Sequence, residues 1–181
     1  GEDLMTLLAK RYATALFALA KEKGAADAVA SDMAALHGEL HAPGAADLLS
    51  SPDVSVEERN KVLSKLSQGR HELVANLVGV MQNRRRLDVL ADMPTAYRDL
   101  FMQDRGEVEG VAESAHPLGA DELKSLTELA NRMSGKKVVL TAKHNPDLLG
   151  GVRLIVGNVL YDGSLRAALT QLQDKLQQSS V

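Results

Sequence analysis

The 181-residue chain has no cysteine and no tryptophan, and it contains only two phenylalanines and three tyrosines. The absence of cysteine excludes disulfide bonds and thiolate metal sites. The scarcity of aromatic residues argues against an aromatic-rich sandwich and favours helices that pack through small and straight-chain side chains. No apolar run approaches the roughly 20 residues that a membrane-spanning helix needs. We therefore expect a soluble protein that faces the cytosol, without a signal or transmembrane segment.

Charge of one sign is also lacking. The chain carries 21 basic and 24 acidic residues, so its net charge is −3. Such a balance provides no strong attraction to nucleic acid or to an anionic membrane. The basic run Arg84-Arg85-Arg86 has no interleaved aromatic residues, and basic residues near a helix end oppose the helix dipole. No nucleic-acid partner is expected.

Apolar residues recur at three- and four-residue steps through residues 1–105, which is the period of amphipathic helices. Ser55 with Glu58 forms a capping box that marks one helix start. The first helix has a main apolar stripe and a weaker second face that includes Ala13 and Phe17, which indicates burial on two sides or a face kept for a partner. The main stripe consists of Leu4, Leu7, Leu8, Tyr12, Ala15, Leu16 and Leu19. The expected helices span residues 4–23, 27–41, 45–49, 56–66, 73–81 and 87–102.

The pattern changes after residue 105. Residues 107–113 alternate polar and apolar side chains, which is the period of a half-buried strand. Gly157-Asn158 is a two-residue turn of hairpin type between two β-branched runs. A helix at 120–133 and strands at 137–142, 152–156 and 159–161 complete the expected elements, with a terminal helix from Leu165. The predicted fold is mainly α: an N-terminal bundle of about six helices (1–105) and a small α+β domain (106–181) with a β-hairpin and a terminal helix.

The strongest candidate for catalytic chemistry is the pair His37 and His41, whose spacing places both imidazoles on one helix face. In a zinc protease a glutamate follows the first histidine directly, whereas Gly38 stands here, and the sequence assigns no third ligand. We expect no catalytic residue, no metal and no cofactor, so the sequence favours an interaction protein over an enzyme. A metal-dependent enzyme that uses the two histidines remains the alternative.

The C-terminal run Asp147 to Leu169, DLLGGVRLIVGNVLYDGSLRAAL, resembles the C-terminal signature of the δ subunit of F-type ATP synthases. That family includes the mitochondrial oligomycin-sensitivity-conferring subunit. Asn145 stands where the family usually has aspartate, and Leu149 stands for isoleucine, but the spacing is kept. Two further segments resemble family motifs in the right order. They are Arg11-Tyr12-Ala13 with Ala15-Leu16-Phe17 and Leu19-Ala20, and Asn76-Leu77-Val78 with Asn83, Arg86-Leu87 and Leu90.

The resemblance implies a non-catalytic stator subunit of a proton-transporting ATP synthase, present in one copy, that links the catalytic head to the peripheral stalk. A groove between the first and fifth helices would hold the N-terminal helix of a head α subunit. The C-terminal part of the chain would bind the stalk b subunit at its C-terminal end, through the final helix and the hairpin. The subunit would lie peripherally on the cytoplasmic face of a bacterial inner membrane. The implied groove residues are Tyr12, Ala15, Leu16, Leu77, Val80 and Met81. The implied fold-determining residues are Gly150, Gly151, Asp162, Gly163 and Ser164. An unrelated helix-binding adaptor is the other alternative.

Overall fold

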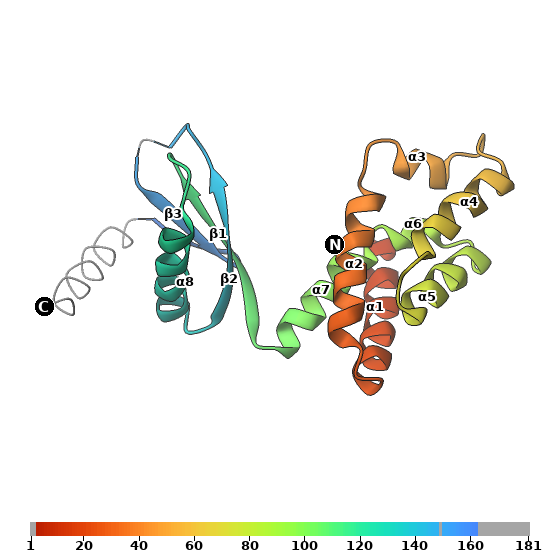
Figure 1. Cartoon of the computed structure of the whole chain (residues 1–181), viewed down its shortest axis with the longest axis horizontal. Coiled ribbons are helices and arrows are strands. Elements are labelled where there is room, and N and C mark those ends of the chain that lie inside the picture. Colours follow the sequence, from red (N-terminus) through yellow and green to blue (C-terminus); the bar gives the residue numbers. More distant parts are fainter. Residues whose placement is uncertain (1–2, 149, 163–181) are drawn as a thin grey trace, which may run out of the picture. The chain divides into compact units, whose positions relative to one another are not determined.

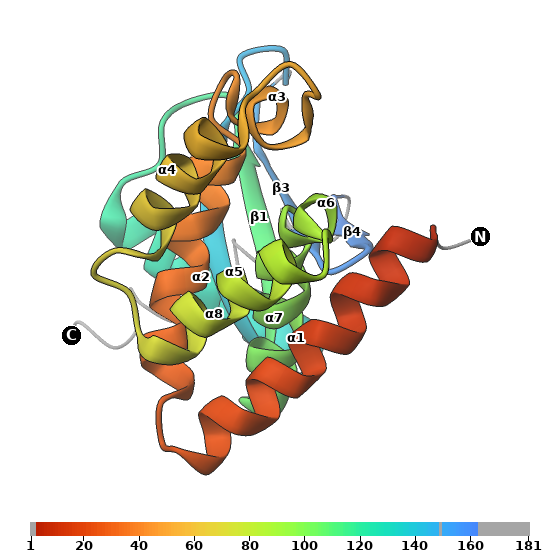
Figure 2. The ribbon, with the colours of Figure 1, turned by 90° about the vertical axis from the view of Figure 1, so that its right-hand side faces the viewer.

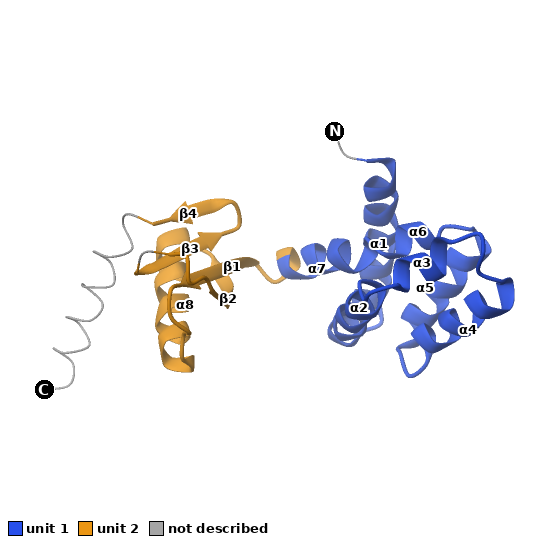
Figure 3. Ribbon diagram, turned by 90° about the horizontal axis from the view of Figure 1, so that it is seen from above, with its two compact units in different colours: residues 1–102 blue, residues 103–181 orange. Residues whose placement is uncertain are grey.

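The computed structural model describes residues 3–148 and 150–162 (Figure 1). The chain divides into two compact units, with the boundary between Met102 and Gln103 (Figure 3). Each unit has its own hydrophobic core. The first unit is helical and the second contains a four-stranded sheet, so the predicted fold class is confirmed. Within the described ranges, none of the helices combines the length and apolarity needed to span a membrane.

The first unit is a bundle of short helices. Its longest described helix is α1, and α7 extends slightly past the unit boundary. The bounds are α1 (Leu4–Glu22), α2 (Ala26–Leu40), α3 (Ala45–Ser50), α4 (Val56–Ser67), α5 (Glu72–Asn83), α6 (Leu87–Leu90) and α7 (Met93–Asp104). The predicted helix start of α4 carries one of the two hydrogen bonds of a capping box, in which the Glu58 backbone N–H donates to Ser55 Oγ at 3.2 Å.

The buried face of α1 differs from the predicted stripe. Its buried residues are Ala9, Ala13, Leu16 and Ala20, whereas Leu4 is 67% exposed and Leu19 is 46% exposed. Alanine occupies three of the four buried positions. Its side chain is a single methyl group, so neighbouring helices can approach α1 closely and leave no voids in the core. Of the two interpretations that the sequence left open for this helix, the exposure of Leu4, Leu7 and Leu19 favours one face that is not covered by the bundle.

The predicted helix at 87–102 is two helices, so that prediction was wrong. The chain leaves α6 after Leu90, and α7 begins at Met93. Pro94 lies in the first turn of α7, where its missing N–H deprives the helix of no hydrogen bond. Within a continuous helix the same proline would have disrupted the hydrogen-bond ladder.

Tyr97 of α7 lies fully buried in the first core. Its hydroxyl donates to the Ala26 carbonyl at 2.9 Å, and its ring packs edge-on against Phe17 at 5.6 Å between centroids. Burial, with a smaller contribution from the Asp27 carboxylate, raises the pKa of Tyr97 from 10.0 to about 12.

This tyrosine predicts how stability changes at alkaline pH. Between pH 10 and about 12 the unfolded chain releases the Tyr97 proton more readily than the folded chain, so the free energy of unfolding falls as the pH rises. Tyr97→Phe is expected to cost about 1 kcal/mol at neutral pH through the lost hydrogen bond. The difference in the free energy of unfolding between wild type and Tyr97→Phe, measured by urea unfolding, should become smaller above pH 10. A difference that stays constant to pH 12 would contradict the assignment.

Replacement of a glycine in α2 is expected to increase stability, whereas Tyr97→Phe decreases it. A Cβ added at Gly38 would meet nothing within 4 Å, and the residue lies inside a helix. Gly38→Ala is therefore expected to raise the free energy of unfolding by about 0.5–1 kcal/mol, because alanine loses less backbone entropy on folding. Gly44→Ala is the control, since φ at Gly44 is +83° and alanine should destabilise there. Thermal unfolding of both variants checks the pair.

The second unit is a sheet with one described helix packed on it (Figure 1). Its strands run in the order β2-β1-β3-β4. β1 pairs parallel with β2 and antiparallel with β3, and β3 and β4 form the predicted hairpin. The bounds are β1 (Glu107–Ser114), α8 (Ala120–Ser134), β2 (Lys137–His144), β3 (Val152–Val156) and β4 (Val159–Tyr161). α8 is the crossover that two parallel neighbouring strands require.

Ion pairs fix the beginning of β1. Glu107 Oε1 lies 3.2 Å from Lys137 Nζ and 3.3 Å from Arg105 Nε. Lys137, followed by Arg105, holds the pKa of Glu107 below its usual range. Because Glu107 and Lys137 are register partners, the pair supports the parallel alignment of β1 with β2.

The residues expected to determine the C-terminal fold lie partly within the described ranges. Gly150 and Gly151 have φ angles of +86° and +77°, a left-handed conformation that favours glycine. Asp162 Oδ2 lies 3.8 Å from Arg153 Nε. Gly163, Ser164 and the predicted terminal helix lie outside the described residues.

Candidate functional site

The predicted groove involves α1 and α5, and the structure places these helices side by side. Arg84 Nη1 donates to the Tyr12 hydroxyl at 3.5 Å, and Lys23 Nζ lies 3.2 Å from Glu72 Oε1. Tyr12 precedes Lys23 along the chain, whereas its partner Arg84 follows Glu72. The two helices therefore run antiparallel, with one polar contact at each end of α5; these contacts correspond to the middle and the C-terminal end of α1. Figure 2 shows α1, in red, along the front of the first unit.

The residues between these two contacts define one surface. Tyr12, Ala15, Leu19 and Lys23 follow each other at three- and four-residue steps, so they share a face of α1. On α5 the same spacing places Asn76 and Val80 between Glu72 and Arg84. We call this region the α1–α5 surface; its members are Tyr12, Ala15, Leu19, Asn76 and Val80.

Apolar side chains on the α1–α5 surface are incompletely covered. Val80 is 40% exposed, Leu19 nearly half exposed, Ala15 exposed and Tyr12 half-buried. Leu4 and Leu7 add exposed apolar area at the start of α1. A long helix that leaves several large apolar side chains in water is typical of a protein–protein contact surface.

The six residues expected to bind a partner fall into two groups. Tyr12, Ala15 and Val80 are accessible to a partner. Leu16, Leu77 and Met81 are buried in the core of the first unit, where they contribute to the packing of α1 and α5. Leu19 was not among the six, although its position seven residues after Tyr12 is the signal that could have identified it.

The contacts at the two ends differ in charge. Lys23 and Glu72 form an exposed and electrically neutral pair, and such pairs contribute at most about 1 kcal/mol. At the other end, Arg84, Arg85 and Arg86 are all exposed. The α1–α5 surface therefore has a positive end and a neutral end.

The histidine pair in α2 is close but incomplete as a metal site. The His37 and His41 ring centroids are 4.1 Å apart, and His41 Nδ1 lies 2.9 Å from the His37 carbonyl oxygen. In the part of the chain that the structure describes, no group of three or more His, Cys, Asp or Glu residues could hold a metal ion. The pair itself therefore offers two ligands at most.

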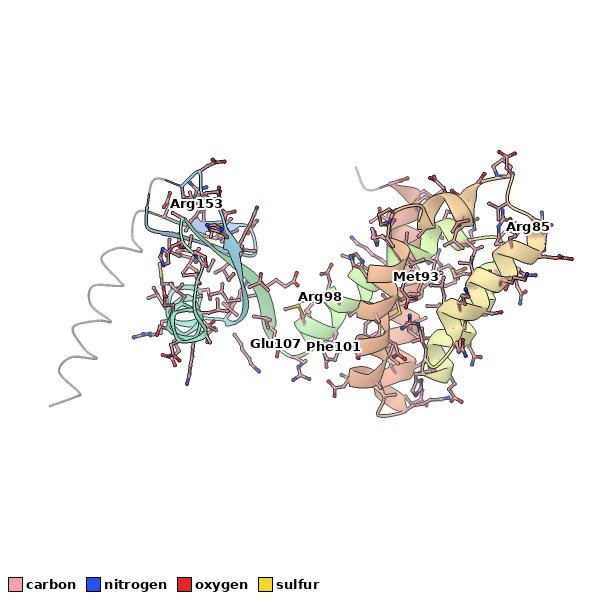
Figure 4. The ribbon with its side chains drawn as sticks, turned by 45° about the horizontal axis from the view of Figure 1, so that its top comes forward. Arg85, Met93, Arg98, Phe101, Glu107 and Arg153 are labelled. Atoms are coloured by element: carbon pink, nitrogen blue, oxygen red, sulfur yellow. The ribbon has the colours of Figure 1, made fainter. Side chains whose placement is uncertain are left out.

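The second unit has a different set of exposed residues. Val159 and Leu160 of β4 are exposed at one edge of the sheet. By register, Leu160 lies in the row of Ile155 and Val111. Next to this row the buried Glu113 carboxylate lies 3.6 Å from Lys143 Nζ and 3.9 Å from Arg153 Nη1. Figure 4 shows Arg153 among the strands of this unit.

Comparison with known proteins gives consistent matches along nearly the whole chain. The family model described as ATP synthase delta (OSCP) subunit matches residues 8–176. The ATP synthase subunit delta of Myxococcus xanthus is 36% identical, covering 94% of this chain and 97% of that protein. The subunit of the same name from Parvibaculum lavamentivorans is 37% identical, covering 96% and 91%. A chain in the cryo-EM structure of the Toxoplasma gondii mitochondrial ATP synthase hexamer is 25% identical with a TM-score of 0.65, covering 97% of this chain and 98% of that one.

Proposed function

The chain belongs to the ATP synthase delta (OSCP) subunit family, and from this premise we propose that it joins the catalytic head to the peripheral stalk. The family is a non-catalytic stator component of ATP synthase. A stator must resist the torque that the turning rotor exerts on the head, so its function is tight binding at two places. A protein of two compact units suits that task.

The first unit would bind the N-terminal helix of a head α subunit on the α1–α5 surface. The observation that carries this proposal is the partial exposure of Leu19 and Val80 on two antiparallel helices, between two polar contacts that join the helices. An amphipathic helix would cover these side chains with its apolar face. Burial of apolar area contributes about 25 cal/mol per Å², and a few well-covered anchors dominate such interfaces.

The second unit would bind the C-terminal end of the stalk b subunit. Val159 and Leu160 on the β3–β4 hairpin are the exposed apolar residues that support this proposal within the described ranges. The final helix, for which the family resemblance implies the same contact, lies outside the described residues. One copy of the chain would then connect one head to one stalk.

The location follows from the partners. We place the subunit at the cytoplasmic face of a bacterial inner membrane, held there through the head and the stalk. The relatives from Myxococcus xanthus and Parvibaculum lavamentivorans are named ATP synthase subunit delta, which supports a place in that complex. Synthesis of ATP and transport of protons would be carried out by the other subunits, to which this chain supplies a fixed link.

Native mass spectrometry tests the two-partner proposal. The full chain is mixed with one peptide of the α-subunit N-terminal helix and another from the C-terminal end of the stalk b subunit, both from its own organism. The proposal predicts a ternary complex with one copy of each component. Mutually exclusive binding would contradict the division of labour between the units. Binding of neither peptide would favour an unrelated helix-binding adaptor.

A further inference from the structure

The turn between α5 and α6 consists of three arginines, and its backbone is unusual. The Arg86 N–H donates to the Met81 carbonyl at 2.8 Å, and the Arg85 N–H donates to the Gln82 carbonyl at 3.1 Å. Together these bonds place Arg85 in the left-handed conformation, with φ at +54°. Arg85 is the only described residue other than the glycines that has a positive φ. A glycine would relieve that strain, so the arginine points to a role other than stability.

The three arginines also have no carboxylate partner among the described residues. None of the ion pairs found there includes Arg84, Arg85 or Arg86. The nearest acidic residue in the sequence is Asp88, whose carboxylate accepts from the backbone N–H of Val89 at the start of α6. Guanidinium groups form their strongest hydrogen bonds with carboxylates and phosphates. The arginine turn therefore offers three guanidinium groups that form no ion pair with any residue in the described part of the chain.

The turn borders the α1–α5 surface. Arg84 donates to the hydroxyl of Tyr12, which is a member of that surface. Arg86 directly precedes α6, and α6 packs against α1. Figure 4 shows Arg85 at the periphery of the first unit, whereas Met93 lies in its interior. A helix lying along the α1–α5 surface would bring one of its ends close to these cations.

We propose that the arginine turn binds carboxylate side chains at one end of the helix that occupies the α1–α5 surface, and so fixes the direction in which that helix lies. The inference rests on the proposed function and adds to it the chemistry of the partner: an amphipathic helix with acidic residues at the end of its apolar stripe. A helix laid in the opposite direction would leave both its carboxylates and the arginines unpaired, which is the repulsive half of specificity.

The test compares two peptides against two proteins. One peptide is the α-subunit N-terminal helix, and the other has every Asp and Glu replaced by its amide. The proteins are wild type and the double variant Arg84→Gln/Arg86→Gln. We expect the variant to bind the native peptide about tenfold more weakly at low salt, mainly through a slower association rate. The amide peptide should bind both proteins equally. Raising the salt should weaken binding to wild type more than binding to the variant.

The control is the double variant Lys124→Gln/Lys136→Gln, which removes the same charge from exposed positions in the second unit. It should bind the native peptide as wild type does. The inference is wrong if the two peptides bind wild type equally, a comparison that does not depend on whether any variant folds. In that case the native peptide still binds and the proposed function stands. If neither peptide binds folded wild type, the proposed function itself fails.

Discussion

Val80→Asp is expected to weaken binding of the α-subunit N-terminal peptide by about 100-fold or more. The side chain is 40% exposed on α5, so a bound helix would bury the remaining apolar area, which is worth up to about 2 kcal/mol. An aspartate there would lose that burial and would also place a carboxylate against an apolar surface. The free energy of unfolding should also fall, by about 1–2 kcal/mol, because the part of the Val80 side chain that is already buried loses its apolar contacts, so binding is measured on variant protein that remains folded. Isothermal titration calorimetry and urea unfolding measure the two quantities.

Two further variants make the result specific. Leu48→Asp introduces the same charge on α3 at a residue that is 45% exposed, and it should leave binding unchanged. Met81→Ala should lower the stability of the fold without changing the exposed residues of the α1–α5 surface. Met81 is fully buried, so its truncation should cost about 2–5 kcal/mol of stability and affect binding only through the fold. Equal loss of binding in Leu48→Asp and Val80→Asp would remove the basis for the α1–α5 surface.

Gly110→Ala is expected to destabilise the second unit by about 2–3 kcal/mol. Gly110 lies in the central strand β1, opposite Leu140 of β2 and Val156 of β3. A Cβ at this position would lie 2.8 Å from Val138 Cγ1 and 3.1 Å from the Ile155 carbonyl oxygen. The carbonyl belongs to the backbone of a paired strand, so it cannot move aside without disturbing the sheet.

Hydrogen exchange with mass spectrometry resolves this effect by region. Amides of β1, β2 and β3 should exchange faster in Gly110→Ala, while those of α1, α2 and α5 should exchange as in wild type, because the two units have separate cores. Gly119→Ala is the matched control in the same unit. The nearest atom to its added Cβ would be Glu122 Oε1 at 3.8 Å, which is an ordinary contact. Faster exchange in both units would contradict their independence.

Local sequence signals predicted most elements of the fold. The capping pair Ser55 and Glu58 and the Gly157-Asn158 hairpin turn depend on side chains and dihedral angles close in sequence, and both appear as expected. The division of residues 87–102 was missed because Pro94 is compatible both with a kink and with a new helix start. Which of the two occurs depends on packing around Leu90 and Met93, both of which are fully buried.

The sequence left open which of the two apolar faces of α1 meets the core, because hydrophobicity alone does not identify the face that other helices cover. In the bundle, close approach of the helices selects Ala9, Ala13 and Ala20. The same limit applies to α5, in which Leu77, Val80 and Met81 are all apolar. Only tertiary packing distinguishes Val80, which is exposed, from its two buried neighbours. The resemblance predicted the pairing of α1 with α5; the assignment of the six residues to a binding role stays a prediction.

Calorimetric titration of the wild-type 181-residue chain with a peptide of the α-subunit N-terminal helix tests the central claim most directly. The account predicts saturable one-to-one binding with a negative heat-capacity change, because apolar side chains on the α1–α5 surface leave water. Absence of binding by a chain that circular dichroism shows to be folded would contradict the assignment of this surface to the catalytic head.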